Sequence, residues 1–428
     1  MLFFSILRYK ITMGGGLMQL VAYGAQDIYL TGNPQITFFK VVYRRHTNFS
    51  MEAIEQTLNG TPVFDGTVDC TISRNGDLIH KMYVEFNVGE VLGSNAEDVH
   101  ANVGHTLLKE MELEIGGQRI DKHYSHWLTT WNELTDHNPT GSKMTLLANS
   151  DIRLEQVAGG LASSFEPTEY QKMSFNHIGV ASLDMTSKTD TPSAYVPLQF
   201  WFCRNVGLAL PLIALQYHEV KLKIKFCPEA DIAATTGKSL QNIKLWVDYI
   251  YLDTDERRRF AQVSHEYLIE QLQTIKVSSA NGPQIFNFNH PVKELIWIGE
   301  ETGTAEVGPT AGSGTPGTID SASKFKIKLN GHDRFSERTR NYFTKTQVYQ
   351  HHSGFGGTTV QDSIAVYSFA LKPEEHQPSG TCNFSRIDNS ELVISNSGDG
   401  GAGNLRLYAV NYNVLRIMSG MGGLAYSN

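Results

Sequence analysis

The stretch M-E-L-E-I-G-G-Q-R-I-D, residues 111–121, decides the fold of this chain. Met111, Leu113 and Ile115 alternate with glutamates, which is the period that places one face of a strand on a core and the other in water. Gly116-Gly117 then allows the positive φ angles that a tight hairpin turn needs. The stretch therefore predicts a half-buried strand that ends in a hairpin.

The chain repeats this pattern once. Phe325, Ile327 and Leu329 alternate with lysines, and Asn330-Gly331 follows, which is a strong signal for a type I′ hairpin turn. Phe325, Leu329 and Gly331 each lie 214 positions after their counterparts in 111–121.

Four further pairs of segments recur in the same order along the chain. They are Ile54-Glu55-Gln56 with Ile269-Glu270-Gln271 (offset 215), Met82 and Val84 with Ile296 and Ile298 (214), 195–198 with 366–369 (171), and Glu219-Val220 with Glu391-Leu392 (172). An insertion of about 43 residues in the first copy, within 125–193, accounts for the fall in offset. Agreement in order across five segments indicates two copies of one β-rich unit.

The composition is that of a globular protein with a low content of charge. Of the 428 residues, 41% are apolar and 19% are charged, below the usual quarter. A low charge content suits a molecule that hides much of its surface in an assembly.

The net charge of −8 predicts no broad footprint for nucleic acid. The basic run Arg257-Arg258-Arg259 follows three acidic residues and is interpreted as part of a locally balanced linker.

The cysteines and the apolar segments restrict the class of protein further. Cys70, Cys203, Cys227 and Cys382 form neither a C-x-x-C motif nor a framework spacing, so we predict free and mostly buried thiols. No apolar run reaches the length that a membrane-spanning helix needs. Residues 1–12 are apolar but too short for a signal peptide with its cleavage site.

We predict four parts of the chain: an N-terminal arm over 1–38, a first unit over 39–254, a linker over 255–264 and a second unit over 265–428. Apolar residues of the arm are too numerous for a permanently solvated tail, so we expect it to bury itself against another part of the assembly. The alternative is an extra edge strand of the first unit.

Turn signals divide both units into short segments. Asn33-Pro34 can begin a helix, and the spacing of Ile36, Phe39 and Val42 predicts a short one over 34–45. Segments rich in Gly, Ser and Thr at 299–323 and 395–404 predict exposed loops. Strands are expected from Met51, around 68–72, and over 78–88, 195–202, 220–226 and 245–252.

Many short strands separated by turn signals, with few helices, are typical of a sandwich or a barrel. We predict an all-β fold of two consecutive eight-stranded antiparallel jelly rolls, a double jelly roll, with short helices in the loops.

No motif predicts catalysis or a bound cofactor. Segments 312–317 and 398–403 match G-x-G-x-x-G, but neither lies between a strand and a helix, so both are interpreted as loop glycines. His123 and His126 are three residues apart and His351-His352 are adjacent, yet the chain has neither H-E-x-x-H nor H-x-H. No G-x-S-x-G supports a nucleophile. We therefore predict that the protein is not an enzyme, with no catalytic, cofactor-binding or metal-binding residue and no cofactor.

Long segments spread along the chain resemble one protein family. They include QLVAYGAQDIYLTGNPQITFFKVVYRRHTNF (19–49), ELEIGGQRIDKHY (112–124), GLALPLIALQYHEVKL (207–222), WVDYIYLDTDERRRFAQVSHEYLIEQLQ (246–273), QPSGTCNFSRIDN (377–389) and YNVLRIMSGMGGLAYSN (412–428). The chain resembles the double jelly-roll major capsid protein of nucleocytoplasmic large DNA viruses, chlorella-virus (phycodnavirus) type. The resemblance weakens at 125–193, 299–323, 350–362 and 395–404, and residues 1–12 lie outside it.

The resemblance implies a late structural protein of the virion, assembled in the host cytoplasm. In this family the chain forms a homotrimeric, pseudo-hexameric capsomer that builds the icosahedral shell of a large double-stranded DNA virus. The implied partners are neighbouring capsomers and minor capsid proteins, with glycans on outer loops and no direct contact with nucleic acid. Asn48, Asn59 and Asn383 head N-x-S/T sequons, but the family's glycosylation sites do not transfer to this chain.

One alternative from another class remains open at this stage: a carbohydrate-binding or cupin-like double β-sandwich protein. Metal or glycan binding by an isolated monomer would favour that alternative, whereas a stable trimer would favour the shell protein.

Overall fold

A computed structural model describes residues 15–22, 24–87, 102–136, 169–174, 193–232, 240, 242–300, 319–354, 363–395 and 404–426. The loops predicted within 299–323 and 395–404 lie mostly outside these residues, as do residues 1–12 and much of 125–193. The chain divides into two compact units, Met1–Asn48 and Phe49–Asn428, and each is described by itself.

The first unit contains two short helices, α1 (Gly15–Val21) and α2 (Ile28–Thr31), followed by turns and irregular backbone. The prediction of a helix over 34–45 is wrong. Asn33 adopts a left-handed φ of 51°, whereas an N-cap residue needs an extended backbone. Phe39 is 98% exposed, so the predicted apolar face packs against nothing in this unit. A helix this short needs such packing to be stable.

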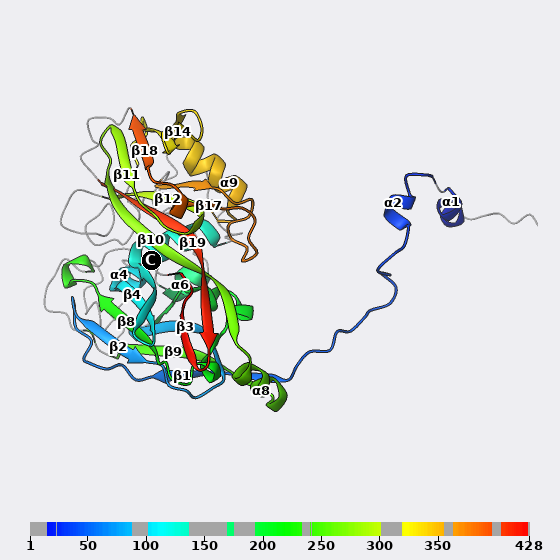
Figure 1. The fold of residues 1–428 in the computed structure, drawn as a ribbon, viewed down its shortest axis with the longest axis horizontal. Helices are drawn as coiled ribbons and strands as arrows, with labels where there is room; N and C mark the ends of the chain where they lie inside the picture. The colour runs from blue at the N-terminus through cyan, green and yellow to red at the C-terminus, as the bar shows by residue number, and fades with distance from the viewer. Residues whose placement is uncertain are drawn as a thin grey trace, which may run out of the picture. The chain divides into compact units, whose positions relative to one another are not determined.

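The second unit begins with a sandwich of two antiparallel sheets (Figure 1). One sheet has the order β1-β9-β3-β6, with β7 beside β3, and the other has the order β2-β8-β4-β5. The strands are β1 (Phe49–Gln56), β2 (Thr67–Thr71), β3 (Leu78–Asn87), β4 (Leu108–Ile115), β5 (Gln118–Tyr124), β6 (Ser193–Pro197), β7 (Leu210–Pro211), β8 (Val220–Phe226) and β9 (Lys244–Leu252).

A second sandwich follows in the chain. Its sheets have the orders β10-β19-β12-β16, with β17 beside β12 and β20 beside β19, and β11-β18-β13-β14, with β15 beside β13. The strands are β10 (His265–Ser278), β11 (Gly282–Phe286), β12 (Pro291–Glu300), β13 (Lys324–Leu329), β14 (His332–Asp333), β15 (Arg338–Thr339), β16 (Ile364–Ser368), β17 (Cys382–Asn383), β18 (Ser390–Ser395), β19 (Asn404–Met418) and β20 (Met421–Leu424).

The two sandwiches share one topology. If the main strands of each are lettered B to I in chain order, both have one sheet with the order B-I-D-G and another with the order C-H-E-F. The five repeated sequence segments fall on strands B, D, E, G and H or at their ends, at equivalent places in both copies. The predicted fold of two jelly rolls is confirmed.

Both predicted hairpins have the expected turn. Ile115 pairs with Gln118 and Leu329 pairs with His332, so each loop has two residues. The φ angles are 58° and 80° at Gly116-Gly117, and 50° and 80° at Asn330-Gly331, which are the two positive values of a type I′ turn.

Each sandwich encloses its own apolar core. In β4, Met111, Leu113 and Ile115 are fully buried in the first core, as the alternation predicts. The outward carboxylate of Glu114 lies 2.5 Å from the Lys223 ammonium on β8. In β13, Phe325 is buried in the second core.

Helices occupy the connections between strands. They are α4 (Val103–Leu107), α5 (Ser125–Thr135), α6 (Glu169–Ser174), α7 (Trp201–Arg204), η4 (Val206–Leu208), η5 (Leu212–Ala214), η6 (Glu229–Asp231), α8 (Thr254–Gln262), η7 (Tyr342–Thr346), α9 (Gln347–His351) and η8 (Phe384–Arg386). The strand predicted over 195–202 stops at Pro197, and α7 follows. Among the described residues no helix is long and apolar enough to cross a membrane.

All four cysteines are free thiols, as the sequence predicts. Cys70, Cys203 and Cys227 are buried, and Cys382 is partly exposed. Burial raises the pKa of the Cys203 thiol to about 12, so it stays protonated.

We predict that Gly331→Val destabilises the second jelly roll by about 1–3 kcal/mol, because a β-branched residue is strained at positive φ. A Cβ atom at Gly331 would meet nothing within 4 Å, so backbone strain alone sets the cost. Thermal unfolding of Gly331→Val and of Gly331→Asn checks this, since asparagine tolerates the left-handed region. Equal melting temperatures for both variants and the parent would contradict the assigned turn.

Candidate functional site: the junction between the two jelly rolls

The sheet β10-β19-β12-β16 is buried on both of its faces. Along β12, Leu295 and Trp297 point into the core of the second sandwich. Ile296 and Ile298 point the other way and join a separate apolar cluster. An antiparallel sheet commonly leaves one face in water, so this second face must be covered by another element.

Helix α5, which follows β5 of the first jelly roll, supplies that cover. Its Trp127, Trp131 and Leu134 lie in the same apolar cluster as Ile296 of β12 and Tyr408 of β19. The rings of Trp127 and Tyr408 are 5.3 Å apart between centroids. These tryptophans lie in the segment predicted to be an insertion, and in the structure they join the two jelly rolls.

Strands β10 and β19 extend beyond their own sandwich (Figure 1). They pair along their whole length, from His265 with Ile417 to Ser278 with Asn404. Ile269, Leu415 and Ile417, near one end of this ladder, belong to the core of the first jelly roll. The ladder therefore contributes to both cores.

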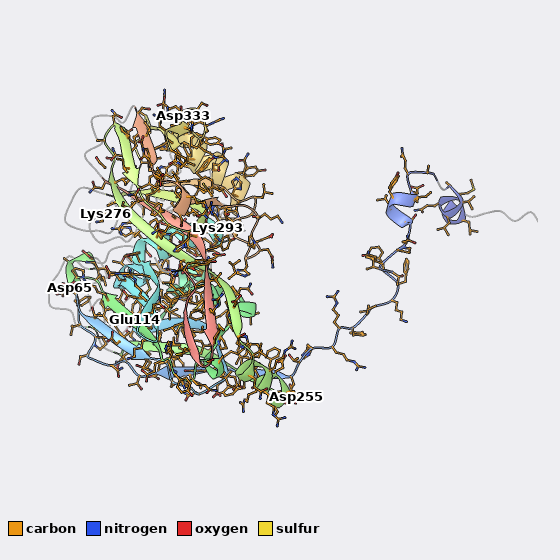
Figure 2. The ribbon with its side chains drawn as sticks, viewed as in Figure 1. Asp65, Glu114, Asp255, Lys276, Lys293 and Asp333 are labelled. Atoms are coloured by element: carbon orange, nitrogen blue, oxygen red, sulfur yellow. The ribbon has the colours of Figure 1, made fainter. Side chains whose placement is uncertain are left out.

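A buried ionic cluster lies at the junction. The Glu270 carboxylate is 2.8 Å from the Arg204 guanidinium of the first jelly roll and 2.8 Å from the Lys293 ammonium of the second. The Lys293 side chain, marked in Figure 2, is 0% exposed and also donates to the Pro373 carbonyl. Arg204 lies over the Trp131 ring, 4.6 Å from its centroid.

The cations keep Glu270 charged. Burial alone would raise the pKa of this carboxyl, but Arg204 and Lys293 outweigh burial and lower the pKa below its ordinary value. Removal of one partner from such a cluster leaves an uncompensated buried charge, which costs more than the intact cluster contributes.

A second ionic cluster lies within the second jelly roll. The His352 imidazole is 3.0 Å from the Glu294 carboxylate and 3.1 Å from the Glu374 carboxylate. Burial would lower the pKa of His352, but the two carboxylates raise it to about 9. The imidazole is therefore a buried cation at neutral pH.

Backbone contacts beside His352 dock the second jelly roll onto α5. The Gly354 amide donates to the Leu134 carbonyl at 2.7 Å, and the Ser353 hydroxyl donates to the Thr135 carbonyl at 3.2 Å. A Cβ atom at Gly354 would lie 2.5 Å from the Glu133 carbonyl oxygen, so only glycine permits this approach.

The histidines singled out from the sequence do not come together as a metal site. His123 pairs with Asp121 at 2.9 Å and stacks on Phe200. His352 belongs to the cluster with Glu294, and His351 lies 3.3 Å from the Leu371 carbonyl. In the part of the chain that the structure describes, no group of three or more His, Cys, Asp or Glu residues could hold a metal ion.

Sequence reasoning missed Glu270, Lys293, Glu294 and α5 as junction elements. A signal was present at 291–298, P-V-K-E-L-I-W-I, where a lysine and a glutamate interrupt an apolar run. Adjacent residues of a strand point to opposite faces, so both charges had to be buried if both faces were apolar.

Comparisons with known proteins agree with this architecture. The family model described as "Major capsid protein N-terminus" matches residues 37–253, and "Large eukaryotic DNA virus major capsid protein" matches residues 256–423. The major capsid protein of Pyramimonas orientalis virus is 54% identical, over 97% of this chain and 100% of the relative. That of Paramecium bursaria Chlorella virus 1 is 43% identical with the same coverage.

Solved structures give the same result. A chain of the PBCV-1 virus capsid superposes with a TM-score of 0.70 at 38% identity, covering 92% of this chain and 100% of that one. The Faustovirus major capsid protein superposes with a TM-score of 0.63 at 15% identity, which reflects likeness of fold alone.

We predict that the stability of the protein falls between about pH 6.5 and pH 9. The pKa of His352 is about 9 in the folded chain and 6.5 for an ordinary histidine. The folded state therefore keeps this proton up to a higher pH than the unfolded state does. The stabilisation is complete below pH 6.5 and is lost as the pH rises through 9, and it amounts to roughly 3 kcal/mol.

Thermal unfolding against pH checks this prediction, with His352→Gln and, as the matched control, His351→Gln. The difference in melting temperature between parent and His352→Gln should shrink as the pH rises, while His351→Gln follows the parent. A constant difference across this pH range would contradict the charged state of His352.

Proposed function

Since the chain belongs to the major capsid protein family of large eukaryotic DNA viruses, we propose that three copies of it form a homotrimeric capsomer with a pseudo-hexagonal outline. The protein is a structural component of the virion that forms the capsid shell of a large DNA virus, and it is not an enzyme. Family membership decides in favour of the shell protein over the carbohydrate-binding alternative.

The repeated topology is the observation that supports the trimer most strongly. Each chain contributes two sandwiches with the same strand order, so three chains contribute six similar faces around one axis. Such a capsomer can occupy a hexagonal lattice although it has only three chains. We further propose that neighbouring capsomers and minor capsid proteins are its partners, with glycans on outer loops and no direct contact with nucleic acid.

The outer face of the sheet β1-β9-β3-β6 is a surface where a second copy would pack. This sheet corresponds to the one that α5 covers in the second jelly roll. Among the described residues its outer face carries an aromatic cluster of Tyr83, Tyr195 and Trp246, with Tyr83 6.1 Å from Tyr195 and 6.3 Å from Trp246 between centroids. Tyr195 is 37% exposed, and Met51 on the same face is 46% exposed.

We propose the same division of the chain as the sequence predicts: an arm over 1–38, jelly rolls over 39–254 and 265–428, and a linker over 255–264. The arm exposes many large apolar side chains in the single chain. They are Leu17, Met18, Leu20, Val21, Ile28, Tyr29, Leu30, Ile36 and Phe38. A segment of this composition favours burial against another shell component, on the side that faces the virion interior.

We predict a stable homotrimer with three times the chain mass of 47.7 kDa. Size-exclusion chromatography with light scattering measures this mass, and negative-stain images should show hexagonal outlines. Tyr195→Arg should weaken the trimer, because a guanidinium in place of the aromatic ring would have to lose its water at the interface. Ile285→Arg, at a 62% exposed position on β11 of another sheet, is the matched control. A monomer at micromolar concentration would refute the trimer.

We predict that deletion of residues 1–33 leaves a folded trimer with little change in melting temperature but weakens its binding to other shell components. The deleted residues lie within the unit Met1–Asn48, and none of them belongs to the apolar core of either jelly roll. Light scattering, thermal unfolding and incorporation into capsids test this, with deletion of residues 1–12 as the control that should change nothing. Failure of the 1–33 deletion to trimerise would place the segment within the core.

A further inference from the structure

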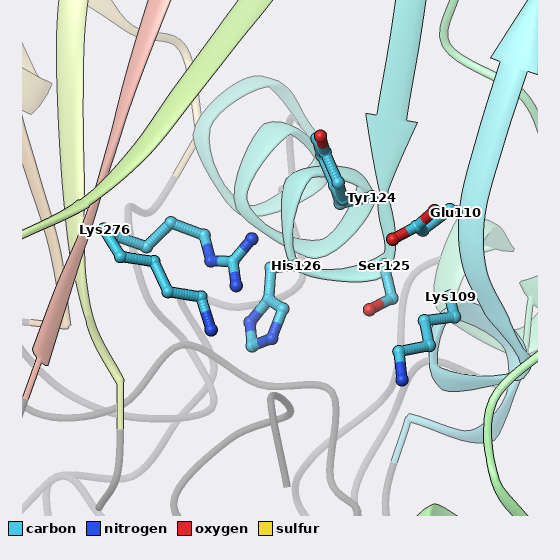
Figure 3. A pocket seen from close by; sticks show the side chains of 7 residues that line it. Lys109, Glu110, Tyr124, Ser125, His126 and Lys276 are labelled. Carbon is cyan, nitrogen blue, oxygen red and sulfur yellow. The ribbon is translucent and has the colours of Figure 1, made fainter.

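The helix that joins the two jelly rolls has a counterpart in the second of them. Helix α5 begins at Ser125, directly after β5 ends at Tyr124 (Figure 3). In the second jelly roll, helical backbone runs without a break over 340–351, which includes η7 and α9, and it begins directly after β15. The two helices start 215 positions apart, the same offset that relates Ile54-Glu55-Gln56 to its copy.

Both helices pack on their own sandwich at the same position. Leu128 of α5 is fully buried in the core of the first jelly roll. The residue 215 positions later is Phe343, which is fully buried in the core of the second. The helix over 340–351 therefore corresponds to α5 in length, in its place after strand F and in the side that it turns toward its own core.

The opposite side of α5 is also covered. Every residue from Ser125 to Leu134 is buried. Trp127, Trp131 and Leu134 lie four and three positions apart, so they share one side of the helix, and all three pack against the sheet β10-β19-β12-β16. This side makes the contact between the jelly rolls.

The corresponding side of the helix over 340–351 is open. Its residues at the equivalent positions are Tyr342, Thr346 and Tyr349. Tyr342 is half-buried and Thr346 is exposed. Tyr349, the counterpart of the fully buried Leu134, is 87% exposed. The side that α5 uses to cover a sheet is thus left to solvent in the single chain, and it presents a large aromatic ring there.

The sheet β1-β9-β3-β6 offers a matching surface. It is the counterpart of the sheet that α5 covers, and its outer face carries the cluster of Tyr83, Tyr195 and Trp246. Trp246 lies on strand I of its sandwich, as does Tyr408, the ring that Trp127 of α5 contacts in the other sandwich. Aromatic side chains favour one another at such contacts, because their rings bury a large area and pack edge to face.

We propose, on the basis of the trimer proposed above, that the helix over 340–351 of one copy packs with Tyr349 on the aromatic face of β1-β9-β3-β6 in the neighbouring copy. In a pseudo-hexagonal ring, about one sixth of a turn relates the first jelly roll to the second, and the next equal step reaches the first jelly roll of the neighbour. The same step carries α5 onto the helix over 340–351, and the sheet that α5 covers onto the neighbour's sheet. The contact between copies therefore repeats the contact within the chain, with a helix from one side and a sheet from the other.

The test follows trimer dissociation of the full-length protein by light scattering over a range of concentrations. Tyr349→Arg should weaken the trimer by about tenfold or more, because it removes an aromatic anchor and places a charge that must lose its water. Tyr349→Phe keeps the ring and should assemble as the parent does. Tyr217→Arg, at a 75% exposed tyrosine between η5 and β8, is the matched control and should also leave the trimer unchanged. Circular dichroism checks that each variant is folded.

The outcomes separate this contact from the trimer itself. A parent trimer together with a Tyr349→Arg variant that assembles equally well would overturn the proposed contact and leave the trimer standing. A parent that is monomeric would overturn both.

A double-mutant cycle identifies the partner surface. Tyr195→Ala and Tyr349→Ala should each weaken the trimer, and together they should weaken it by less than the product of their separate effects, because both remove the same contact. The pair of Tyr195→Ala with Tyr217→Ala is the control, in which the separate effects should multiply. Effects of Tyr195→Ala and Tyr349→Ala that multiply in the same way would show that the two tyrosines do not meet, and the proposal would be lost.

Discussion

The structure depends on one constraint, which is that the sheet β10-β19-β12-β16 must be covered on both faces. Its strands alternate between residues that belong to the second core, such as Trp297, and apolar residues on the opposite face, such as Ile296. A sheet with two apolar faces is stable only between two other layers. The second sandwich supplies one layer and α5 of the first jelly roll supplies the other, so neither jelly roll is complete without this junction.

The same constraint explains why the junction contains buried charges. Glu270, Lys293 and Glu294 lie on strands that have no face in water, and each carries a charge that burial would make costly. Glu270 is matched by Lys293 and Arg204, and Glu294 by His352. The Arg204–Glu270 pair joins the two jelly rolls, and it is satisfied in only one relative position of them. Such a pair restricts that position more than apolar contact alone does. A shell subunit needs that fixed geometry, because an error in the angle between its sandwiches is repeated across the lattice.

The sequence predicts the parts of this structure whose signals are local. The alternation in 111–115, the positive-φ turn at Gly331 and the recurrence of five segments together predict two jelly rolls. The junction is not local, since α5 is recognised only from the face it covers, and a buried ion pair such as Arg204 with Glu270 joins residues far apart in the chain. The helix predicted over 34–45 is absent because a local signal alone does not suffice. Its regularly spaced apolar residues have no apolar surface to pack against in their unit.

The two copies differ most in the connection between strands F and G, and this difference gives the chain its asymmetry. In the first copy the connection contains α5, which covers the sheet of the second copy. In the second copy it contains α9, whose Val348 lies in that same apolar cluster. Both helices therefore cover one sheet, while the equivalent face of β1-β9-β3-β6 keeps the aromatic cluster around Trp246 partly exposed. A chain that covers one of two equivalent sheet faces with its own helices leaves the other face for the neighbouring copy that we propose. In the proposed homotrimer this asymmetry repeats three times around one axis, whereas a chain with both sheets fully covered would have no such face left for a neighbouring copy.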